Sequence, residues 1–526
     1  MKKLTCLLLI LAMVSCLALA EGDGLTAYEQ PITVTTARTM TETAVFDAND
    51  PSKKSYQENL WTDTFRNELN IDLKYDWVAT DGSADMSKWS AAIATSMVPD
   101  FARVDGSIYK LLLDADLMAD CTDLYAQYAT EEYKALLNDS LLSQMTYGGR
   151  LMGLPFPNKG YMGATMLFVR QDWLDRLGLS YPTNYEEIVS VAKAFKEAKL
   201  GGEGTQGLMF SWNTSDGKLD GLMNMFGAFR DYWLEKDGRL EFSNVQPEMR
   251  DALLELQKLY ADGLINQDFA VTTADLSKEY IAGGKCGIFF ATSWNTTTSI
   301  QALYDNDPEA NVVSHVIFGR DGGDILFQTN APTVGRVFVS ANSEHPEAVM
   351  KMLNLSYQLT TDEYEKYGVD ATGHMWFKYL PFGDMPRSAL TDILNAHEIA
   401  VAYQQGVTDG SGFNWTDPTN SARYEKYLAS VAGEGTTWYK LTYGVDGVYS
   451  KLYDAYMAGL QLSNAYLGLP TETQELMGDV INDQLNSAMI DVIMGADISV
   501  FDAACEAWLS NGGAAIQEEV NEASGR

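Results

Sequence analysis

Histidine and basic residues are scarce in this sequence. Its 526 residues include four histidines, and 37 lysines and arginines stand against 72 aspartates and glutamates, which gives a net charge of −35. No two histidines lie within one helical turn of each other, so His-rich metal sites and HExxH hydrolases are excluded. The negative surface repels phosphate backbones and anionic lipid headgroups, which argues against nucleic-acid binding.

Cysteine is also rare. Cys6 and Cys16 lie among the first twenty residues, which leaves Cys121, Cys286 and Cys505 for the rest of the chain. An odd number of widely spaced cysteines forms neither a disulfide framework nor a zinc cluster. We therefore expect these three thiols to belong to the core.

The common motifs of nucleotide-binding and hydrolytic enzymes are missing or misplaced. The chain contains neither a GxxxxGK[ST] loop nor a GxSxG elbow. Residues 202–207 match GxGxxG, but a helix pattern precedes them and a strand pattern follows, whereas a dinucleotide fold needs the reverse order. We expect no cofactor, no metal and no enzymatic activity, although abundant carboxylates leave a glycosidase pair open.

Long apolar runs are absent except near the N-terminus. Two lysines precede the apolar residues 4–14, a run that is too short to span a bilayer but typical of a signal peptide. The small-x-small residues 18–20 predict cleavage after Ala20. The alternative is the imperfect lipobox at residues 13–16, which would leave a lipid on Cys16. We favour the first, and in both cases the protein works outside the membrane.

Helix and strand patterns alternate along the rest of the chain, which predicts an α/β fold with a mainly parallel sheet. Thr183 and Glu186 form a capping box at the N-cap and N3 positions of a helix that ends before Gly201, and residues 471–474 form a second. The alternation predicts strands at 31–35, 71–75, 166–169, 208–212, 286–291 and 335–341, a strand with its loop at 99–106, and helices at 56–69, 86–96, 172–177, 247–261 and 346–357.

Pairs of tryptophan and asparagine are the strongest ligand signal. Trp212 and Asn213 follow one apolar strand, Trp294 and Asn295 follow another, and Trp415 comes directly after an asparagine in a polar segment. A flat indole beside an amide suits sugar rings, whose C–H faces stack on aromatic rings while their hydroxyls form hydrogen bonds. These pairs therefore predict a ligand-binding role.

Residues 168–183, together with 99–100 and 149–155, resemble a known family. They are similar to the extracellular solute-binding proteins of family 1, and within these to oligosaccharide-binding lipoproteins that supply ABC importers. The resemblance implies a two-lobed periplasmic-binding-protein fold of type II, with a ligand cleft between lobes joined by crossing segments. Relatives often carry a calcium loop where this chain has residues 199–207, whose only carboxylate is Glu203, so we expect no calcium there.

We predict an extracytoplasmic solute-binding protein of an ABC importer, a monomer that captures an oligosaccharide and delivers it to a membrane permease. A receptor for a peptide or another non-sugar solute is the alternative, and a secreted carbohydrate-active hydrolase is less favoured. The predicted parts are a signal peptide at 1–20, a polar lead-in at 21–30, lobe one at 30–160 plus 325–400, and lobe two at 161–324 plus 401–526. Trp212, Trp294 and Trp415 would stack on the ligand. Its other predicted contacts are Asn213, Asn295, Arg103 and Asp105, with Tyr161 and Trp376 lining a wall.

Overall fold

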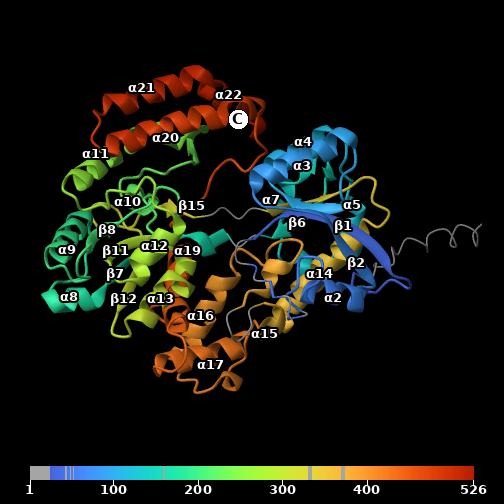
Figure 1. The fold of residues 1–526 in the computed structure, drawn as a ribbon, viewed down its shortest axis with the longest axis horizontal. Coiled ribbons are helices and arrows are strands. Elements are labelled where there is room, and N and C mark those ends of the chain that lie inside the picture. The colour runs from blue at the N-terminus through green and yellow to red at the C-terminus, as the bar shows by residue number, and fades with distance from the viewer. Residues whose placement is uncertain are drawn as a thin grey trace, which may run out of the picture. The chain divides into compact units, whose positions relative to one another are not determined.

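The computed structural model describes residues 24–526 apart from 42–43, 45, 48, 51, 158–159, 330–333 and 369–373. The expected signal peptide, its cleavage point and Cys16 lie outside the described residues. The chain divides into two compact units (Figure 1), unit 1 with Met1–Asn158 and Thr333–Ser388, and unit 2 with Lys159–Pro332 and Ala389–Arg526. The sequence analysis placed the boundaries between the two lobes after residues 160, 324 and 400.

Unit 1 contains a five-stranded mixed sheet in the order β2-β1-β3-β14-β6. Strand β1 runs parallel to β2 and β3, whereas β14 runs antiparallel to β3 and β6. The elements of this unit are β1 (Ile32–Thr39), α2 (Leu60–Leu69), β2 (Ile71–Ala79), α3 (Gly82–Thr95), β3 (Phe101–Val104), α4 (Gly106–Asp114), α5 (Thr122–Tyr128), α6 (Glu131–Lys134), α7 (Asp139–Ser143), β4 (Thr146–Tyr147), β5 (Arg150–Leu151), β6 (Leu154–Pro157), β14 (Val334–Val339), α14 (Glu347–Asp362), α15 (Tyr364–Tyr367) and η4 (Trp376–Tyr379).

Alternating side chains of β14 give the unit 1 sheet two packed faces. Val337 and Val339 join a buried cluster with Trp61 and Phe65 of α2. Phe338 lies between them in the sequence and contacts the ring of Trp89 in α3, at 5.9 Å between centroids. Because successive side chains of a strand point to opposite faces, helices cover both sides of this sheet.

Unit 2 is built on a four-stranded sheet in the order β12-β7-β11-β8. Its elements are η1 (Gly160–Gly163), β7 (Thr165–Arg170), α8 (Gln171–Leu177), α9 (Tyr185–Glu197), β8 (Gln206–Met209), α10 (Asp220–Asn224), β9 (Trp233–Lys236), β10 (Arg239–Phe242), η2 (Ser243–Val245), α11 (Pro247–Ala261), α12 (Ala274–Ala282), β11 (Cys286–Thr292), η3 (Ser293–Thr297), α13 (Ser299–Asn306), β12 (Val312–Val316) and β13 (Phe327–Gln328), followed by the C-terminal elements α16 (Thr391–Gln404), η5 (Gly410–Gly412), α17 (Asn420–Val431), α18 (Trp438–Tyr443), α19 (Val448–Met457), β15 (Gln461–Leu462), η6 (Gln474–Gly478), α20 (Asp479–Ile493), α21 (Ser499–Trp508), η7 (Leu509–Gly513) and α22 (Ala514–Ala523).

The α/β class is confirmed, but the expectation of a mainly parallel sheet is wrong. In the four-stranded sheet of unit 2, β8 and β11 are the one parallel pair, because β7 runs antiparallel to both of its neighbours, β11 and β12. Whether two strands run parallel or antiparallel depends on the path of the chain between them. The local alternation of apolar and polar residues is the same for both directions, so it does not reveal strand direction.

Aromatic residues fill both faces of the unit 2 sheet. Phe168 and Phe289 stack on one face at 5.4 Å, and Phe210 and Phe290 stack on the other at 5.9 Å. Gly287 leaves room for helix packing, since a Cβ there would lie 2.1 Å from the ring of Phe195 in α9. In Figure 1 the C-terminal helices α20, α21 and α22 lie beside α11, and α11 packs against α20.

The predicted helix at α9 is confirmed, but its cap lies one residue later. The N-cap is Asn184, whose side chain accepts a 2.9 Å hydrogen bond from the Glu187 N–H, and the Thr183 hydroxyl donates instead to the Glu187 carboxylate. The matched Thr/Glu spacing is shifted by one position in the folded helix. The second box is confirmed, because Thr471 N–H donates to Gln474 Oε1 and Gln474 N–H donates to Thr471 Oγ1.

The assignment of Asn184 as the N-cap of α9 can be tested by its effect on stability. We expect Asn184→Ala to lower the free energy of unfolding by about 1 kcal/mol, because the Glu187 N–H loses its acceptor. Thr183→Ala removes only an exposed hydroxyl contact, so it should lower the free energy of unfolding by about 0.5 kcal/mol at most. Urea unfolding followed by circular dichroism compares the two. An equal loss in both variants would contradict the assignment of the cap.

The three remaining cysteines are unpaired, with Cys121 and Cys286 buried and Cys505 half-buried. Burial raises the pKa of each thiol to about 12. The GxGxxG match at residues 202–207 lies between α9 and β8, so the helix-then-strand order is confirmed. Over the described ranges no helix has the length and apolarity needed to cross a membrane.

Candidate functional site

Two predicted tryptophans follow the carboxyl ends of two neighbouring parallel strands. Strands β8 and β11 pair in parallel, with Leu208 opposite Ile288 and Met209 opposite Phe289. Trp212 lies three residues after the end of β8, and Trp294 is the second residue of η3, directly after β11. Parallel strands end at the same edge of a sheet, where open α/β sheets bind ligands. We call this the carboxyl edge of unit 2.

Main-chain hydrogen bonds tie the loops of the carboxyl edge together. The Thr292 N–H donates to Ser215 O at 3.1 Å, which joins the Trp212 loop to the end of β11. The Ser293 N–H donates to Ala164 O at 2.9 Å, which joins η3 to the segment that carries Tyr161. Three of the predicted residues, Trp212, Trp294 and Tyr161, therefore belong to one bonded set of loops.

A buried ion pair supports the Trp212 ring. The Arg230 guanidinium lies 4.4 Å from the centroid of this ring and donates to Trp212 O at 2.8 Å. It also donates to both oxygens of Asp220, at 3.0 and 3.2 Å. Burial alone would raise the pKa of Asp220, but the charges of Arg230 and Lys218 outweigh it, so this pKa is lowered. Trp212 is 5% exposed, and the arginine covers one face of its indole.

The asparagines beside the two tryptophans differ in exposure. Asn213 is exposed, whereas Asn295 is fully buried and accepts a hydrogen bond from the Thr292 hydroxyl. Asp216 lies at the same edge, where it pairs with the end of β11 and accepts a hydrogen bond from Ser299. Burial raises the pKa of the Asp216 carboxyl. Asn295 thus serves the η3 turn in this structure, and its predicted contact with a ligand hydroxyl stays a prediction.

An aromatic row that the sequence analysis missed continues from Tyr161. Its ring meets Tyr456 of α19 edge to face at 5.3 Å. One helical turn earlier in α19, Tyr453 stacks on His397 of α16 at 3.9 Å. All four rings are partly exposed. The spacing of two tyrosines at i and i+3 inside a helix was visible in the sequence, but only the fold brings Tyr456 to Tyr161 and Tyr453 to His397.

Trp415 lies on a different part of unit 2. It precedes α17, donates from Nε1 to Gly410 O at 2.6 Å, and contacts Phe413 and Tyr424 at 4.7 and 5.3 Å between ring centroids. These contacts do not connect it to the carboxyl edge. Its predicted stacking on a ligand stays a prediction.

The remaining predicted residues belong to unit 1. Arg103 of β3 donates to Phe382 O at 3.0 Å and covers the Phe156 ring at 4.5 Å, and burial lowers its pKa. Asp105 caps α4 by accepting from the Ile108 N–H at 2.8 Å. Trp376 is 7% exposed and belongs to the buried core of this unit. Each has a structural role, and their ligand contacts stay predictions.

Residues 199–207, for which we expected no calcium site, connect α9 to β8. Glu203 in this segment is exposed and pairs with Lys199 at 2.8 Å. In the part of the chain that the structure describes, no three His, Cys, Asp or Glu side chains are grouped so that they could hold a metal ion.

A family model described as bacterial extracellular solute-binding protein matches residues 48–358, which is more than half of the chain. The chain belongs to this family. Lipoprotein LipO of Bacillus subtilis (strain 168) is 24% identical over 408 residues, which cover 74% of this chain and 75% of LipO. The polygalacturonan/rhamnogalacturonan-binding protein YtcQ of the same strain is 24% identical over 315 residues, 57% of this chain and 60% of YtcQ.

Solved structures share the fold of this solute-binding protein. Alginate-binding protein AlgQ2 without calcium ion superposes with a TM-score of 0.65 at 16% identity, covering 96% of this chain and all (100%) of AlgQ2. The Streptococcus pneumoniae substrate-binding protein FusA in complex with kestose superposes with a TM-score of 0.60 at 14% identity, covering 94% of this chain and 100% of FusA. The two-unit α/β fold expected from the sequence is therefore confirmed.

Proposed function

We propose that this solute-binding protein is the extracytoplasmic receptor of an ABC importer and that its ligand is an oligosaccharide. The observation that carries the proposal is the pair of tryptophans at the ends of β8 and β11 (Trp212 and Trp294), which lie at one edge with the exposed amide of Asn213. Indole faces and amides together match the C–H faces and hydroxyls of sugar rings.

The ligands of similar proteins support a sugar ligand. YtcQ is named for polygalacturonan and rhamnogalacturonan, AlgQ2 for alginate, and the FusA structure contains kestose. These sugars differ in charge and linkage, and what they share is a chain of pyranose or furanose rings. The ligand class proposed for this chain is accordingly an oligosaccharide, without a choice of sugar.

The remaining parts of the proposal concern export and delivery. A leader that is cleaved after Ala20, or alternatively a lipid anchor at Cys16, would place the receptor outside the cytoplasmic membrane. A monomeric receptor would then pass its ligand to the permease subunits of the importer. The family described above consists of extracellular solute-binding proteins, which supports this location.

Thermal unfolding of the chain from Glu21 onward tests the ligand class. We expect one series among plant, algal and host oligosaccharides to raise the melting temperature by a few degrees, because a ligand at 100 times its Kd adds about 2.7 kcal/mol of stability. Chromatography should recover that oligosaccharide uncut. Short peptides form the second panel. A shift with peptides alone would replace the sugar by a peptide ligand, and cleaved sugar would indicate a hydrolase.

A further inference from the structure

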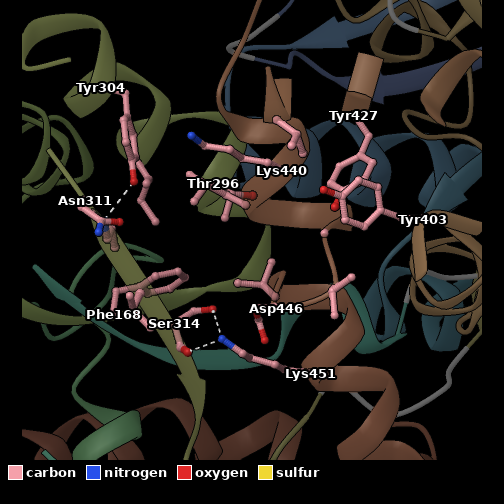
Figure 2. A pocket seen from close by; sticks show the side chains of 18 residues that line it. Phe168, Thr296, Tyr304, Asn311, Ser314, Tyr403, Tyr427, Lys440, Asp446 and Lys451 are labelled. Carbon is pink, nitrogen blue, oxygen red and sulfur yellow. Dashed lines mark hydrogen bonds between the residues drawn. The ribbon is translucent and has the colours of Figure 1, made fainter. Parts of the chain in front are cut away.

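A pocket of about 340 Å³ lies beside β12 in unit 2 (Figure 2). Residues of β12, η3, α13, α16, α17, α18 and α19 line it, together with Phe168 of β7. Strand β12 is an edge strand, because it pairs only with β7 in the sheet order. Val312, Val313 and Ser314 of β12 line the pocket. The end of this strand, at Val316, pairs with Met166 near the start of β7, on the side of the carboxyl edge. Thr296 of η3 also lines the pocket, so the pocket borders the turn that carries Trp294.

Two main-chain groups of the β12 edge, the Val312 N–H and the Ser314 carbonyl, are already bonded inside this pocket. Tyr304 Oη accepts from the Val312 N–H at 2.9 Å. Lys451 Nζ donates to Ser314 O at 2.7 Å and to the Ser314 hydroxyl at 3.4 Å (dashed lines in Figure 2). An added peptide strand would need these same edge groups. The pocket is therefore closed to strand addition and open to a smaller molecule.

Lys440 supplies an uncommitted positive charge. It is exposed on α18, and in Figure 2 its side chain extends across the pocket toward Tyr304. Among the described residues its ammonium group has no hydrogen bond or ion pair, in contrast to that of Lys451. Asp446 is the one carboxylate among the residues that line the pocket, against the two lysines. The pocket thus carries a positive balance in a chain whose net charge is −35.

Apart from Thr296 and Asn311, the rest of the lining is apolar or aromatic, and the Thr296 hydroxyl is already bonded to Ser293 O and to the Thr442 hydroxyl. Tyr403 and Tyr427 meet edge to face with their centroids 5.2 Å apart, and both border the cavity. The aliphatic wall consists of Ile300, Val313, Val431, Leu441, Val445 and Val448. These aliphatic side chains offer no hydrogen-bonding groups, so sugar hydroxyls placed against them would lose hydrogen bonds to water without replacement on that side. A ring without hydroxyls loses nothing on entering and gains contact with the tyrosines.

We propose that this pocket is a second ligand site, which binds a small carboxylate whose body is an apolar ring. The carboxylate meets Lys440, and the ring packs between the tyrosines and the aliphatic wall. The cavity volume lies near the lower end of the range for small-molecule sites, which fits a single-ring compound. The proposal does not rest on the oligosaccharide proposed for the carboxyl edge.

Calorimetric titration of the whole chain with phenylacetate, and with phenylacetamide as its neutral counterpart, tests the proposal. We expect phenylacetate to bind and the amide to bind about tenfold more weakly, because only the acid forms a charge-assisted hydrogen bond. Lys440→Gln should weaken phenylacetate about tenfold and leave the amide unchanged. Lys199→Gln is the matched control, since this lysine is also exposed but lies in the loop before β8. It should bind phenylacetate like the unaltered chain.

A second variant tests the pocket itself without changing a charge. Val431 is 42% exposed at the end of α17, so Val431→Trp should fold and fill the pocket, which abolishes phenylacetate binding. The thermal response to the oligosaccharide should persist in this variant, and its loss would mean that the pocket belongs to the carboxyl-edge site. Equal affinity for acid and amide, unchanged phenylacetate binding in the folded Lys440 and Val431 variants, or no binding by the unaltered chain would each overturn the proposal.

Discussion

Replacing Asp220 by asparagine is expected to lower the free energy of unfolding by about 3 to 5 kcal/mol. Its carboxylate is buried and accepts both hydrogen bonds from Arg230, whose side chain is 9% exposed. Without the negative charge the guanidinium stays buried without its counter-ion, and that unpaired charge accounts for most of the cost. Arg230 also supports the Trp212 ring, so the loss extends to the carboxyl edge.

Urea unfolding measures this loss, with Asp262→Asn as the matched control. Asp262 forms an ion pair with Lys193 at 3.1 Å, but both side chains are about half exposed. An exposed pair contributes about 0 to 1 kcal/mol, so the control should change little. Similar losses in both variants would show that the Asp220 pair does not behave as a buried one.

Asp220→Asn should also change how the free energy of unfolding depends on pH in the acid range. The pKa of Asp220 is lower in the folded chain than in the unfolded chain, so its stabilising contribution is fully present above the unfolded value of about 3.9. That contribution is lost as the pH falls through the folded pKa. The difference in stability between the unaltered chain and Asp220→Asn should therefore be constant near neutral pH and shrink below about pH 4. A difference that stays constant through this range would contradict the pKa shift.

Replacing Trp294 by alanine is expected to weaken oligosaccharide binding by about 1 to 3 kcal/mol, or about 5- to 150-fold in Kd, by analogy with the loss of other aromatic stacking contacts. Trp294 is partly exposed on η3, so a ligand could reach its ring, whereas Arg230 covers one face of Trp212. Trp212→Ala should weaken binding within the same range, and in addition it should leave Arg230 without its aromatic contact.

Calorimetric titration with the oligosaccharide that gives the largest thermal shift measures both losses. Trp438→Ala is the control, since this tryptophan is also partly exposed in unit 2 but stacks on Tyr439 in α18 at 3.8 Å. It should bind like the unaltered chain. If the Trp212 and Trp294 variants both retain full affinity while folded, the carboxyl edge does not bind the sugar.

Local signals predicted most elements well. Pro247 at the first turn and apolar residues at helical spacing gave α11 with the bounds that the structure shows, and the apolar run before Trp294 gave β11 to within one residue. Strand direction was not available in this way. It depends on the route of the chain through a whole unit, which is why the two antiparallel partners of β7 were not anticipated.

The candidate site was predicted in part, for a similar reason. A tryptophan at the exit of an apolar strand marks a position at a sheet edge, and this local pattern located Trp212 and Trp294. Arg230 carries no such mark, because it reaches Trp212 only through the fold of the intervening α10 segment. The burial of Asn295 was equally invisible, since an asparagine that braces a turn and one that faces solvent look alike in sequence.

The unpaired thiols make this chain convenient for site-directed spectroscopy. Cys121 and Cys286 are buried, and the pKa of all three thiols lies far above neutrality, so little reactive thiolate exists at pH 7. A cysteine introduced at an exposed position of each unit would be the preferred target for maleimide dyes or spin labels. Energy transfer between such a pair would report how the distance between the units changes when a ligand is added, with the native thiols left in place.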